Sequence, residues 1–422
     1  MGTIKSANYR KPAYLLILLD ILGFGLLYIS KSYNMNVVYT GIAVLVLFLV
    51  MYTVLVICRM GDKFIMLMAF MLMSFMLMSI VVLLLCRINL DYGFRQIIWI
   101  LVGGAAFFVA YFIYYNIKIW DRFWYIYFAI GVGLFLFTLV LGTTINGSKN
   151  WVSFGPITFQ PSEITKIMYI MCLACYYSGA WSKPVLGKLS PKWITLAITY
   201  IFVGFLVLQR DWGTILVLFS IYLFMVYVYE KDKKLLFLNI GALGIIGILG
   251  YKFLYHIQVR ISTWLDPWSD IASKGYQITQ SLFAIASGGY FGRGLGNGSP
   301  YYIPEVHSDF IFAAICEEMG VFGGVAVILL FFLIAYRCFK ISIMASDPYD
   351  KAVSFGVTVM FAIQTFIIIG GVTKMIPLTG ITLPFVSYGG TSIVISFASL
   401  GIVQAISAKT ERKGEMTENE DE

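Results

Sequence analysis

The sequence predicts an all-α fold, a polytopic membrane helical bundle of about 12 transmembrane helices with a large extracellular loop. Of the 422 residues, 60% are hydrophobic and only 12% are charged, whereas soluble domains have about 45–50% apolar and about 25% charged residues. The apolar residues suffice for about a dozen helices of about 20 residues each. Stretches such as 64–86 and 235–251 are apolar throughout, which excludes the alternating pattern of a transmembrane barrel.

Twelve apolar segments are read as membrane spans, for which about 20 residues are typical. An even number of spans places both termini on the same side of the membrane. The predicted spans are residues 13–30, 37–58, 64–86, 95–115, 121–142, 161–179, 193–208, 214–229, 235–255, 309–336, 353–373 and 385–407.

The basic residues predict the orientation of this bundle. With both termini in the cytoplasm, 19 of the 30 Lys and Arg residues lie on the cytoplasmic side and ten on the outer side. This matches the basic excess that cytoplasmic loops carry. Because the basic residues are dispersed over short loops, the net charge of +8 does not indicate nucleic-acid binding. Membrane lipids are the expected surroundings of such an apolar bundle. The Cys residues, including Cys172 and Cys175, lie mostly in apolar runs and are interpreted as small hydrophobic residues.

Two outer connections are longer than the rest and are candidate functional regions. Residues 143–160 form a polar loop, and residues 256–308 form a loop rich in aromatic residues, within which 275–287 has the pattern of a short amphipathic helix. We expect the second loop to fold onto the bundle. The charged tail, 408–422, lacks aromatic residues and is predicted to be disordered.

Charged residues inside a predicted span are candidates for a functional site. In PSEITK (161–166), Glu163 and Lys166 lie three residues apart on one helical face and can pair. Two interpretations remain open: a structural ion pair, or a pair that lines a polar cavity. Asp211, in a tight connection beside Arg210, is interpreted as the N-cap of the next helix in preference to a functional acid.

Acidic residues and His307 near residue 309 raise the question of a metal site. Glu305, His307 and Asp309 alternate just before a predicted span, and Glu317 and Glu318 follow. The chain has two His and no H-E-x-x-H spacing, so this pattern does not predict zinc. It is more compatible with a loosely held Mg²⁺ or Mn²⁺ on carboxylates and phosphates. The glycine run 288–298 lacks nucleotide-binding spacing and is interpreted as a tight turn.

The long loop also combines charges of both signs. Arg260, Asp266, Asp270 and Lys274 lie within fifteen residues, beside aromatic residues. Such a surface suits sugar-phosphate chemistry, because cations hold phosphate and a carboxylate can take a hydroxyl proton.

Six segments occur in one order and together closely resemble the SEDS family (shape, elongation, division and sporulation), which includes RodA, FtsW and SpoVE. They are GSKNWVSFGPITFQPSE (147–163), LQRDWGT (208–214), RISTWLDPWSD (260–270), GYQITQSLFAIASGG (275–289), GRGLGNGSPYYIPEVHSDFIFAAICEEMG (292–320) and MIPLTGITLPFVSYGGTS (375–392).

The resemblance implies a peptidoglycan glycosyltransferase that polymerises lipid II into glycan strands on the outer face of the bacterial cytoplasmic membrane. A class B penicillin-binding protein is the implied partner. Asp270 is the implied catalytic residue, a general base, and Asp266 ranks below it. The implied substrate-binding residues are Lys149, Trp151, Gln160, Ser162, Glu163, Lys166, Arg260, Lys274, Tyr276, Gln280, His307, Asp309 and Ser387.

The chain departs from the family pattern at three places. A ten-span core, 64–407, is preceded by an N-terminal segment, 1–63, that adds two helices. Arg210 stands where the family usually has Pro, and Thr391 stands where Ser is commoner.

In the implied reaction, the 4-hydroxyl of the acceptor attacks the anomeric carbon of the donor and displaces polyprenyl pyrophosphate with one inversion. Asp270 takes the hydroxyl proton, and Arg260, Lys274 or Lys149 stabilises the leaving pyrophosphate. No cofactor is required, although a divalent cation is compatible with the reaction. Two alternatives stay open on the residues alone: a lipid II flippase or other transporter, and a scaffold for a penicillin-binding protein.

Overall fold

The structure is a computed structural model that describes residues 10–30, 35–58, 60–87, 91–145, 147–155, 157–179, 191–231 and 233–421. Its helices are α1 (Arg10–Ser30), α2 (Met35–Ile57), α3 (Lys63–Arg87), α4 (Asp91–Asn116), α5 (Trp124–Leu141), α6 (Pro161–Tyr177), α7 (Pro191–Gln209), α8 (Trp212–Tyr229), α9 (Lys234–Phe253), α10 (Tyr255–Leu265), α11 (Tyr276–Gly288), α12 (Ile311–Met344), α13 (Pro348–Val372) and α14 (Gly390–Asp421). The short elements are the 3₁₀ helices η1 (Trp120–Arg122), η2 (Pro267–Asp270) and η3 (Pro300–Tyr302) and the strands β1 (Thr143–Ile145), β2 (Ser148–Phe154) and β3 (Ile157–Phe159).

The predicted polytopic helical fold is confirmed. Each of the twelve predicted spans coincides with a helix. Within the described ranges, ten helices are long and apolar enough to cross a membrane. The other two are α3, with a described apolar stretch of Lys63–Leu77, and α6, which has 17 residues and carries Glu163 and Lys166.

The chain divides into two compact units, each assembled from three stretches. Unit 1 comprises Met1–Ala105, Leu249–Ile334 and Gln364–Ser396. Unit 2 comprises Ala106–Ile248, Ala335–Ile363 and Phe397–Glu422. Residues 1–9, at the start of the predicted N-terminal segment, lie outside the described part of the chain.

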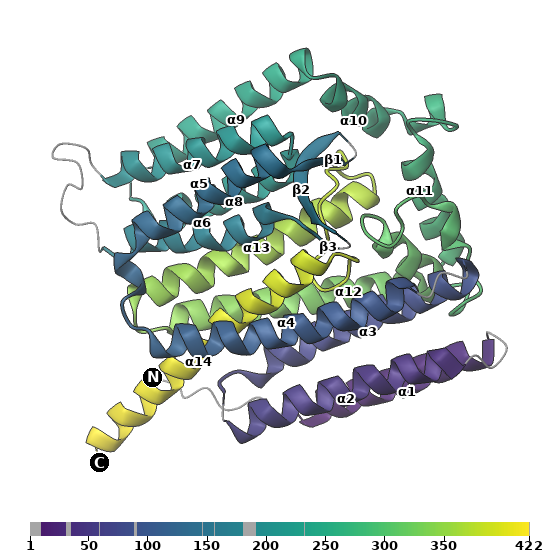
Figure 1. Ribbon diagram of the computed structural model, residues 1–422, viewed down its shortest axis with the longest axis horizontal. Coiled ribbons are helices and arrows are strands. Elements are labelled where there is room, and N and C mark those ends of the chain that lie inside the picture. Colours follow the sequence, from purple (N-terminus) through teal and green to yellow (C-terminus); the bar gives the residue numbers. More distant parts are fainter. Residues whose placement is uncertain are drawn as a thin grey trace. The chain divides into compact units, whose positions relative to one another are not determined.

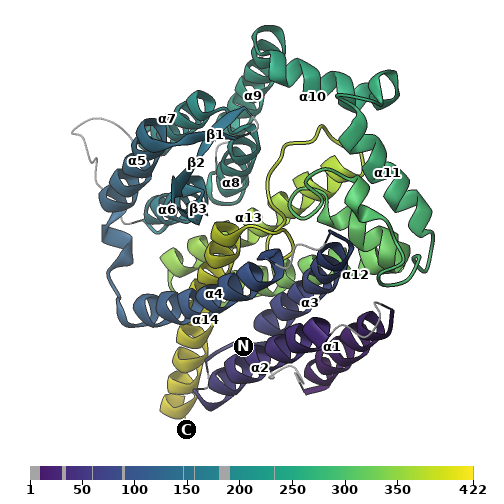
Figure 2. The same ribbon diagram turned by 45° about the vertical axis from the view of Figure 1, so that its right-hand side comes forward.

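In unit 1, the two N-terminal helices pack with α3 (Figure 2). The α1–α2 contact is close: a Cβ at Gly41 would lie 2.8 Å from the ring of Phe24. Asp20 of α1 is only 1% exposed. It is a buried acid within an apolar helix that the sequence analysis did not single out.

In unit 2, α5 packs on α6 and α7, and α8 packs on α6 and α7 (Figure 1). The polar loop 143–160 is ordered here as an antiparallel sheet, β1-β2-β3, which the sequence analysis did not predict. Side chains alternate along β2: Asn150 and Val152 are buried, whereas Ser153 is exposed. The sheet packs through β2 on α5, α6 and α7.

The long loop 256–308 is largely helical and is tied to the end of α13. Its amphipathic stretch forms α11, as predicted, whereas α10 was not predicted. The indole of Trp264 donates to the Lys374 carbonyl at 3.1 Å, and the Ser281 hydroxyl donates to the Val372 carbonyl at 3.1 Å. These bonds agree with the expectation that the loop folds onto the helices.

Two predicted spans differ from the helices in detail. The span 309–336 corresponds to α12, which is interrupted at Gly320 (φ 70°, ψ −171°). A Cβ there would lie 2.4 Å from the Gly292 amide nitrogen, so the break requires glycine. The span 385–407 begins only at Gly390, because Phe385 has φ 62° and the Ser387 hydroxyl accepts from the Leu383 amide at 2.8 Å. This local bond competes with helix formation.

The C-terminal tail also differs from the prediction. Helix α14 continues to Asp421 (Figure 1), so the segment predicted to be disordered is helical in the structure. Extending an existing helix avoids the unfavourable nucleation step, which explains how a polar tail can follow an apolar span as a helix.

The connection between α7 and α8 explains the Arg in place of the family's Pro. The amide of Asp211 donates to Leu206 at 3.0 Å and that of Arg210 donates to Val207 at 3.1 Å. This is the Schellman arrangement, in which the residue after the helix is left-handed and is usually Gly. Arg210 has φ 60°, a value that the ring of Pro cannot adopt.

We therefore expect Arg210→Gly to stabilise the protein by about 1 kcal/mol, because Gly adopts positive φ without strain. Arg210→Pro should destabilise it, because both φ and the amide donor are lost. Thermal unfolding of purified protein in detergent measures both effects. A Pro variant as stable as wild type would contradict this description of the turn.

Candidate functional site

Asp211 is the centre of a buried polar cluster in unit 2. One carboxylate oxygen accepts from the Thr214 amide at 3.1 Å, so the predicted N-cap of α8 is confirmed. The other oxygen accepts from three side chains, Asn150 at 3.0 Å, Gln160 at 3.3 Å and Ser162 at 3.3 Å. Hydrogen bonds to Asp211 thus connect the motif 208–214 to the motif 147–163. The predicted N-cap role did not include these contacts.

Glu163 and Lys166 form a buried ion pair on α6. The Lys166 ammonium lies 2.8 Å from the Glu163 carboxylate. The Glu163 side chain is 5% exposed and the Lys166 side chain is 3% exposed. The predicted pairing is therefore confirmed. Ser162, one residue earlier, binds Asp211, so the pair adjoins the polar cluster around that residue.

Lys149 and Trp151 lie on β2. The Lys149 ammonium donates to the Leu139 carbonyl at 2.5 Å, near the C-terminal end of α5, where a cation is favoured by the helix dipole. Trp151 pairs across the sheet with Thr143, whose hydroxyl donates to its carbonyl at 3.3 Å. The structure thus gives Lys149 a helix-capping contact, which the expectation of a pyrophosphate contact did not include.

In unit 1, a tight turn holds Asp270 at the end of η2. The Asp270 carbonyl accepts from the Gly275 amide at 2.9 Å, and its carboxylate accepts from the Lys274 amide at 3.4 Å. A Cβ at Gly275 would lie 2.1 Å from the Pro267 carbonyl oxygen, so the turn requires glycine. Asp270 is partly exposed. Most of the hydrogen-bonding capacity of its carboxylate therefore remains available to a substrate.

Asp266 has a different role in the same segment. Its carboxylate accepts from the Trp268 amide at 3.1 Å and caps η2. Asp266 is exposed. Its capping role agrees with ranking it below Asp270.

Lys274, Tyr276 and Gln280 follow Asp270. Lys274 is exposed, with its ammonium 5.6 Å from the centroid of the Tyr255 ring. Tyr276 begins α11, and Gln280 lies four residues later, on the same face of the helix. Both are partly exposed.

Arg260, His307, Asp309 and Ser387 come from three motifs and are linked through backbone atoms. The Arg260 guanidinium donates to the Thr379 carbonyl at 2.7 Å. A Cβ on the next residue, Gly380, would lie 3.6 Å from both Arg260 Nη2 and Asp309 Oδ2. The structure therefore brings Arg260 and Asp309 to the same glycine.

The segment before the last helix completes this group. The Ser387 hydroxyl donates to the Ser308 carbonyl at 2.6 Å, and the Tyr388 amide donates to the His307 carbonyl at 2.8 Å. The imidazole Nε2 of His307 lies 3.7 Å from the Glu305 carboxylate. Two predicted substrate-binding residues, His307 and Ser387, are thus held by adjacent backbone contacts.

Asp309 lies just before α12 and has a perturbed acidity. Loss of hydration raises the pKa of Asp309 to about 6, and the negative charge of Glu305 adds to the shift. A hydrogen bond from Ser308 and the positive charge of Arg260 act in the opposite direction. Asp309 therefore changes charge near pH 6.

The glycine run 288–298 binds the two glutamates at the break in α12. The Glu318 carboxylate accepts from the amides of Gly296 and, at 2.9 Å, Gly298. The Glu317 carboxylate accepts from the Ser299 amide at 2.9 Å and lies 3.6 Å from the Arg293 guanidinium. Backbone amides of the glycine run thus bind a carboxylate. This is a more specific role than the tight turn that the sequence predicted.

The acidic residues and His307 that the sequence offered as metal ligands lie in the ranges that the structure describes. No group of three or more His, Cys, Asp or Glu that could hold a metal ion occurs there. Glu317 and Glu318, considered in the sequence as metal ligands, bind backbone amides instead.

Residues 64–412 match a family model described as cell cycle protein, covering FtsW, RodA and SpoVE. The peptidoglycan glycosyltransferase RodA of Mycobacterium tuberculosis (strain ATCC 25618 / H37Rv) is 34% identical over 327 residues, which cover 74% of this chain and 70% of that protein. Stage V sporulation protein E of Bacillus subtilis (strain 168) is 35% identical over 324 residues, which cover 74% of this chain and 86% of that protein.

Solved structures share the fold. One, described as "Structural coordination of polymerization and crosslinking by a peptidoglycan synthase complex", has a TM-score of 0.69 at 24% identity and covers 83% of this chain and 98% of that chain. The rod shape determining protein RodA of Thermus thermophilus has a TM-score of 0.59 at 23% identity and covers 83% of this chain and 97% of that chain.

The Asp211 cluster can be tested with Asp211→Asn. Asn caps a helix as well as Asp does, so a residue that only caps α8 would tolerate the change. In the cluster, an amide nitrogen would replace an oxygen that accepts from Asn150, Gln160 and Ser162. We expect a loss of about 1–3 kcal/mol of stability, measured by thermal unfolding. An unchanged melting temperature would mean that Asp211 stabilises the protein only as the N-cap of α8.

The pKa of Asp309 predicts a pH dependence of stability. The pKa of Asp309 is about 6 in the folded protein and about 3.9 in the unfolded chain. The folded protein therefore binds more protons than the unfolded chain between these pH values. Stability should therefore fall as pH rises from about 4 to 6. Asp309→Asn removes this contribution, so the variant should gain stability relative to wild type as pH rises. Parallel pH curves of melting temperature for the two proteins would contradict the assignment.

Proposed function

Since the chain belongs to the FtsW, RodA and SpoVE family, as its six motifs predict, we propose that it is a peptidoglycan glycosyltransferase. The proposed reaction polymerises lipid II into glycan strands. The observation that carries the proposal is the 34% identity over 327 residues to proteins named peptidoglycan glycosyltransferase RodA. The partly exposed Asp270 carboxylate, in the motif 260–270, provides a general base for this reaction.

The proposed general base is Asp270. Its carboxylate receives one long hydrogen bond, from the Lys274 amide at 3.4 Å. By contrast, the Asp211 carboxylate receives four hydrogen bonds and that of Glu163 lies in a buried ion pair. Asp270 is thus better placed to accept a proton from a sugar hydroxyl, a contribution typically of about 10²–10⁴-fold to the rate.

The reaction is one displacement with inversion. The 4-hydroxyl oxygen of the acceptor forms a bond to the anomeric carbon of the donor, and Asp270 takes the hydroxyl proton. The bond from that carbon to the pyrophosphate oxygen breaks, and polyprenyl pyrophosphate leaves with the electron pair. Lys274, exposed and four residues from Asp270, is the proposed cation for the leaving group. Arg260 is the second, although one of its nitrogens already binds Thr379.

The proposed reaction requires no cofactor. The Asp270 carboxylate and pyrophosphate are hard oxygen donors of the kind that Mg²⁺ or Mn²⁺ prefers. A divalent ion at this site would take most of its ligands from the substrate, since the described residues offer no cluster of three or more protein ligands.

The proposed setting is the bacterial cytoplasmic membrane, with both termini in the cytoplasm and the loop 256–308 outside. The excess of basic residues, 19 against ten, supports this orientation. The proposed partner is a class B penicillin-binding protein. A structural neighbour described as part of a peptidoglycan synthase complex supports an assembly of this kind.

Asp270→Asn tests the general base. The variant keeps the side-chain shape and removes the proton-accepting charge, in a partly exposed turn, so folding should survive. We expect glycan synthesis from labelled lipid II, read as chains on a gel, to fall by about two orders of magnitude or more.

Asp266→Asn is the matched control, because Asn still accepts the Trp268 amide and should retain most of the activity. Both variants should keep the wild-type melting temperature. Near-normal polymerisation by Asp270→Asn would refute the general-base assignment.

A further inference from the structure

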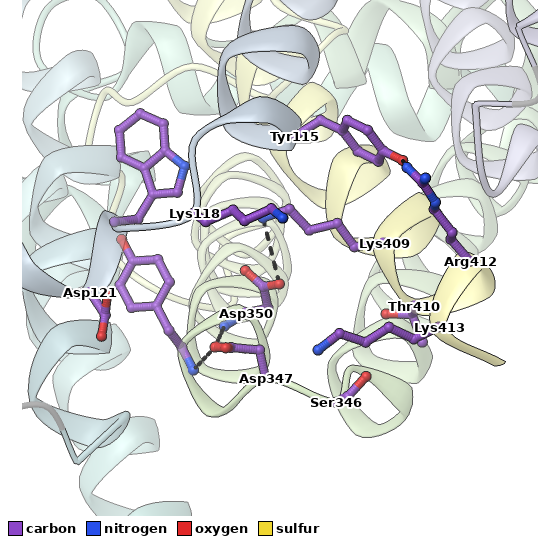
Figure 3. A pocket seen from close by; sticks show the side chains of 12 residues that line it. Tyr115, Lys118, Asp121, Ser346, Asp347, Asp350, Lys409, Thr410, Arg412 and Lys413 are labelled. Carbon is purple, nitrogen blue, oxygen red and sulfur yellow. Dashed lines mark hydrogen bonds and ion pairs between the residues drawn. The ribbon is translucent and has the colours of Figure 1, made fainter. Parts of the chain in front are cut away.

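Unit 2 contains a pocket of about 480 Å³ that the proposed reaction does not use (Figure 3). Its lining comes from three stretches: residues 115–121 at the end of α4 and just after it, residues 346–350 at the start of α13, and residues 409–413 of α14. The volume falls within the range of small-molecule sites, about 300–1,000 Å³.

Three carboxylates line the pocket, Asp121, Asp347 and Asp350, and the protein binds the last two. Asp347 accepts from the Tyr349 amide at 2.8 Å and from the Asp350 amide at 3.3 Å, which caps α13. Asp350 accepts from the Tyr114 hydroxyl at 2.7 Å and lies 3.8 Å from the Lys409 ammonium. Asp347 and Asp350 are therefore already bound by groups of the protein. The donors and the Lys409 ammonium partly compensate their negative charge.

The cations retain more capacity to bind a ligand. Lys118 is exposed and, among the described residues, makes neither a hydrogen bond nor an ion pair. Arg412 is exposed, and its guanidinium donates from one nitrogen to the Tyr115 hydroxyl at 3.1 Å. Lys118 and Lys409 both line the pocket, with Arg412 and Lys413 on the next turn of α14 (Figure 3). The pocket thus has four basic residues against three carboxylates, a small net positive charge, and its exposed cations are suited to phosphate.

The pocket lies at the ends of candidate membrane spans. Spans end at Asn116 and Lys413, and one begins at Pro348. Exposed apolar side chains flank it: Ile113, Ile117 and Ile119 are 47%, 38% and 45% exposed. Basic pockets between membrane helices bind anionic lipid head groups, and the apolar flank offers a surface for the acyl chains.

We propose that this pocket binds the phosphate head group of an anionic phospholipid. Lys118 and Arg412 contact the phosphate, and the apolar flank before Trp120 contacts the lipid tails. The lipid would thereby link α4, α13 and α14 at one membrane surface. This inference is independent of the proposed glycosyl transfer, because neither Asp270 nor the loop 256–308 contributes to the pocket.

The test is cardiolipin binding to purified full-length protein, measured as retained lipid by native mass spectrometry and as a rise in melting temperature. The double variant Lys118→Gln/Arg412→Gln should weaken cardiolipin binding by at least about ten-fold. The matched control Lys231→Gln/Lys340→Gln loses the same charge outside the pocket and should bind as wild type. Lys118, Arg412 and Lys231 are exposed and Lys340 is partly exposed, so both double variants should keep the lipid-free melting temperature.

Two further arms distinguish the source of the phosphate. Phosphatidylcholine should not compete, because its head group is zwitterionic, and inorganic phosphate at equal concentration should give no comparable stabilisation. Equal stabilisation by inorganic phosphate would overturn the lipid assignment in favour of a soluble phosphate ligand. Undiminished cardiolipin binding by Lys118→Gln/Arg412→Gln, or an equal loss in the control, would overturn the site.

Discussion

The structure depends on satisfying polar groups that are buried among apolar helices, where an unpaired group is expensive. Asp211 is the clearest case: one carboxylate closes the first turn of α8 and accepts from three side chains of the preceding motif. Glu163 and Lys166 neutralise one another on α6. These contacts explain why the motif 147–163 has polar residues at closely spaced positions.

The same constraint separates structural acids from the proposed catalytic one. Glu318 is held by backbone amides of the glycine run and Asp211 by side-chain donors. Asp270 lies in a turn whose geometry is set by backbone contacts to Gly275, while its own carboxylate has one long hydrogen bond. A rigid backbone with an accessible carboxylate is the arrangement that general-base catalysis requires, since the group must be positioned and still accept a proton.

The sequence predicted the features that follow from hydrophobic runs and local spacing. The helices, the Glu163–Lys166 pair and the N-cap at Asp211 all depend on residues close in sequence. It did not predict contacts between distant segments, such as Asn150 with Asp211 or Arg260 with Thr379, because no local pattern encodes them. The left-handed Arg210 and the break at Gly320 were also missed. Arg210 closes the Schellman turn of α7 without the Gly that usually indicates one, and the break at Gly320 depends on the close approach of Gly292, which is distant in sequence.

The central claim is that this chain itself joins sugars. The decisive experiment uses wild-type protein with a class B penicillin-binding protein, the proposed partner, in liposomes that contain labelled lipid II. Glycan length, released polyprenyl pyrophosphate and lipid II movement are measured together. A glycosyltransferase should give β-linked chains and release one polyprenyl pyrophosphate for each bond formed. Lipid II that crosses the bilayer without being polymerised would contradict the central claim and would indicate a transporter.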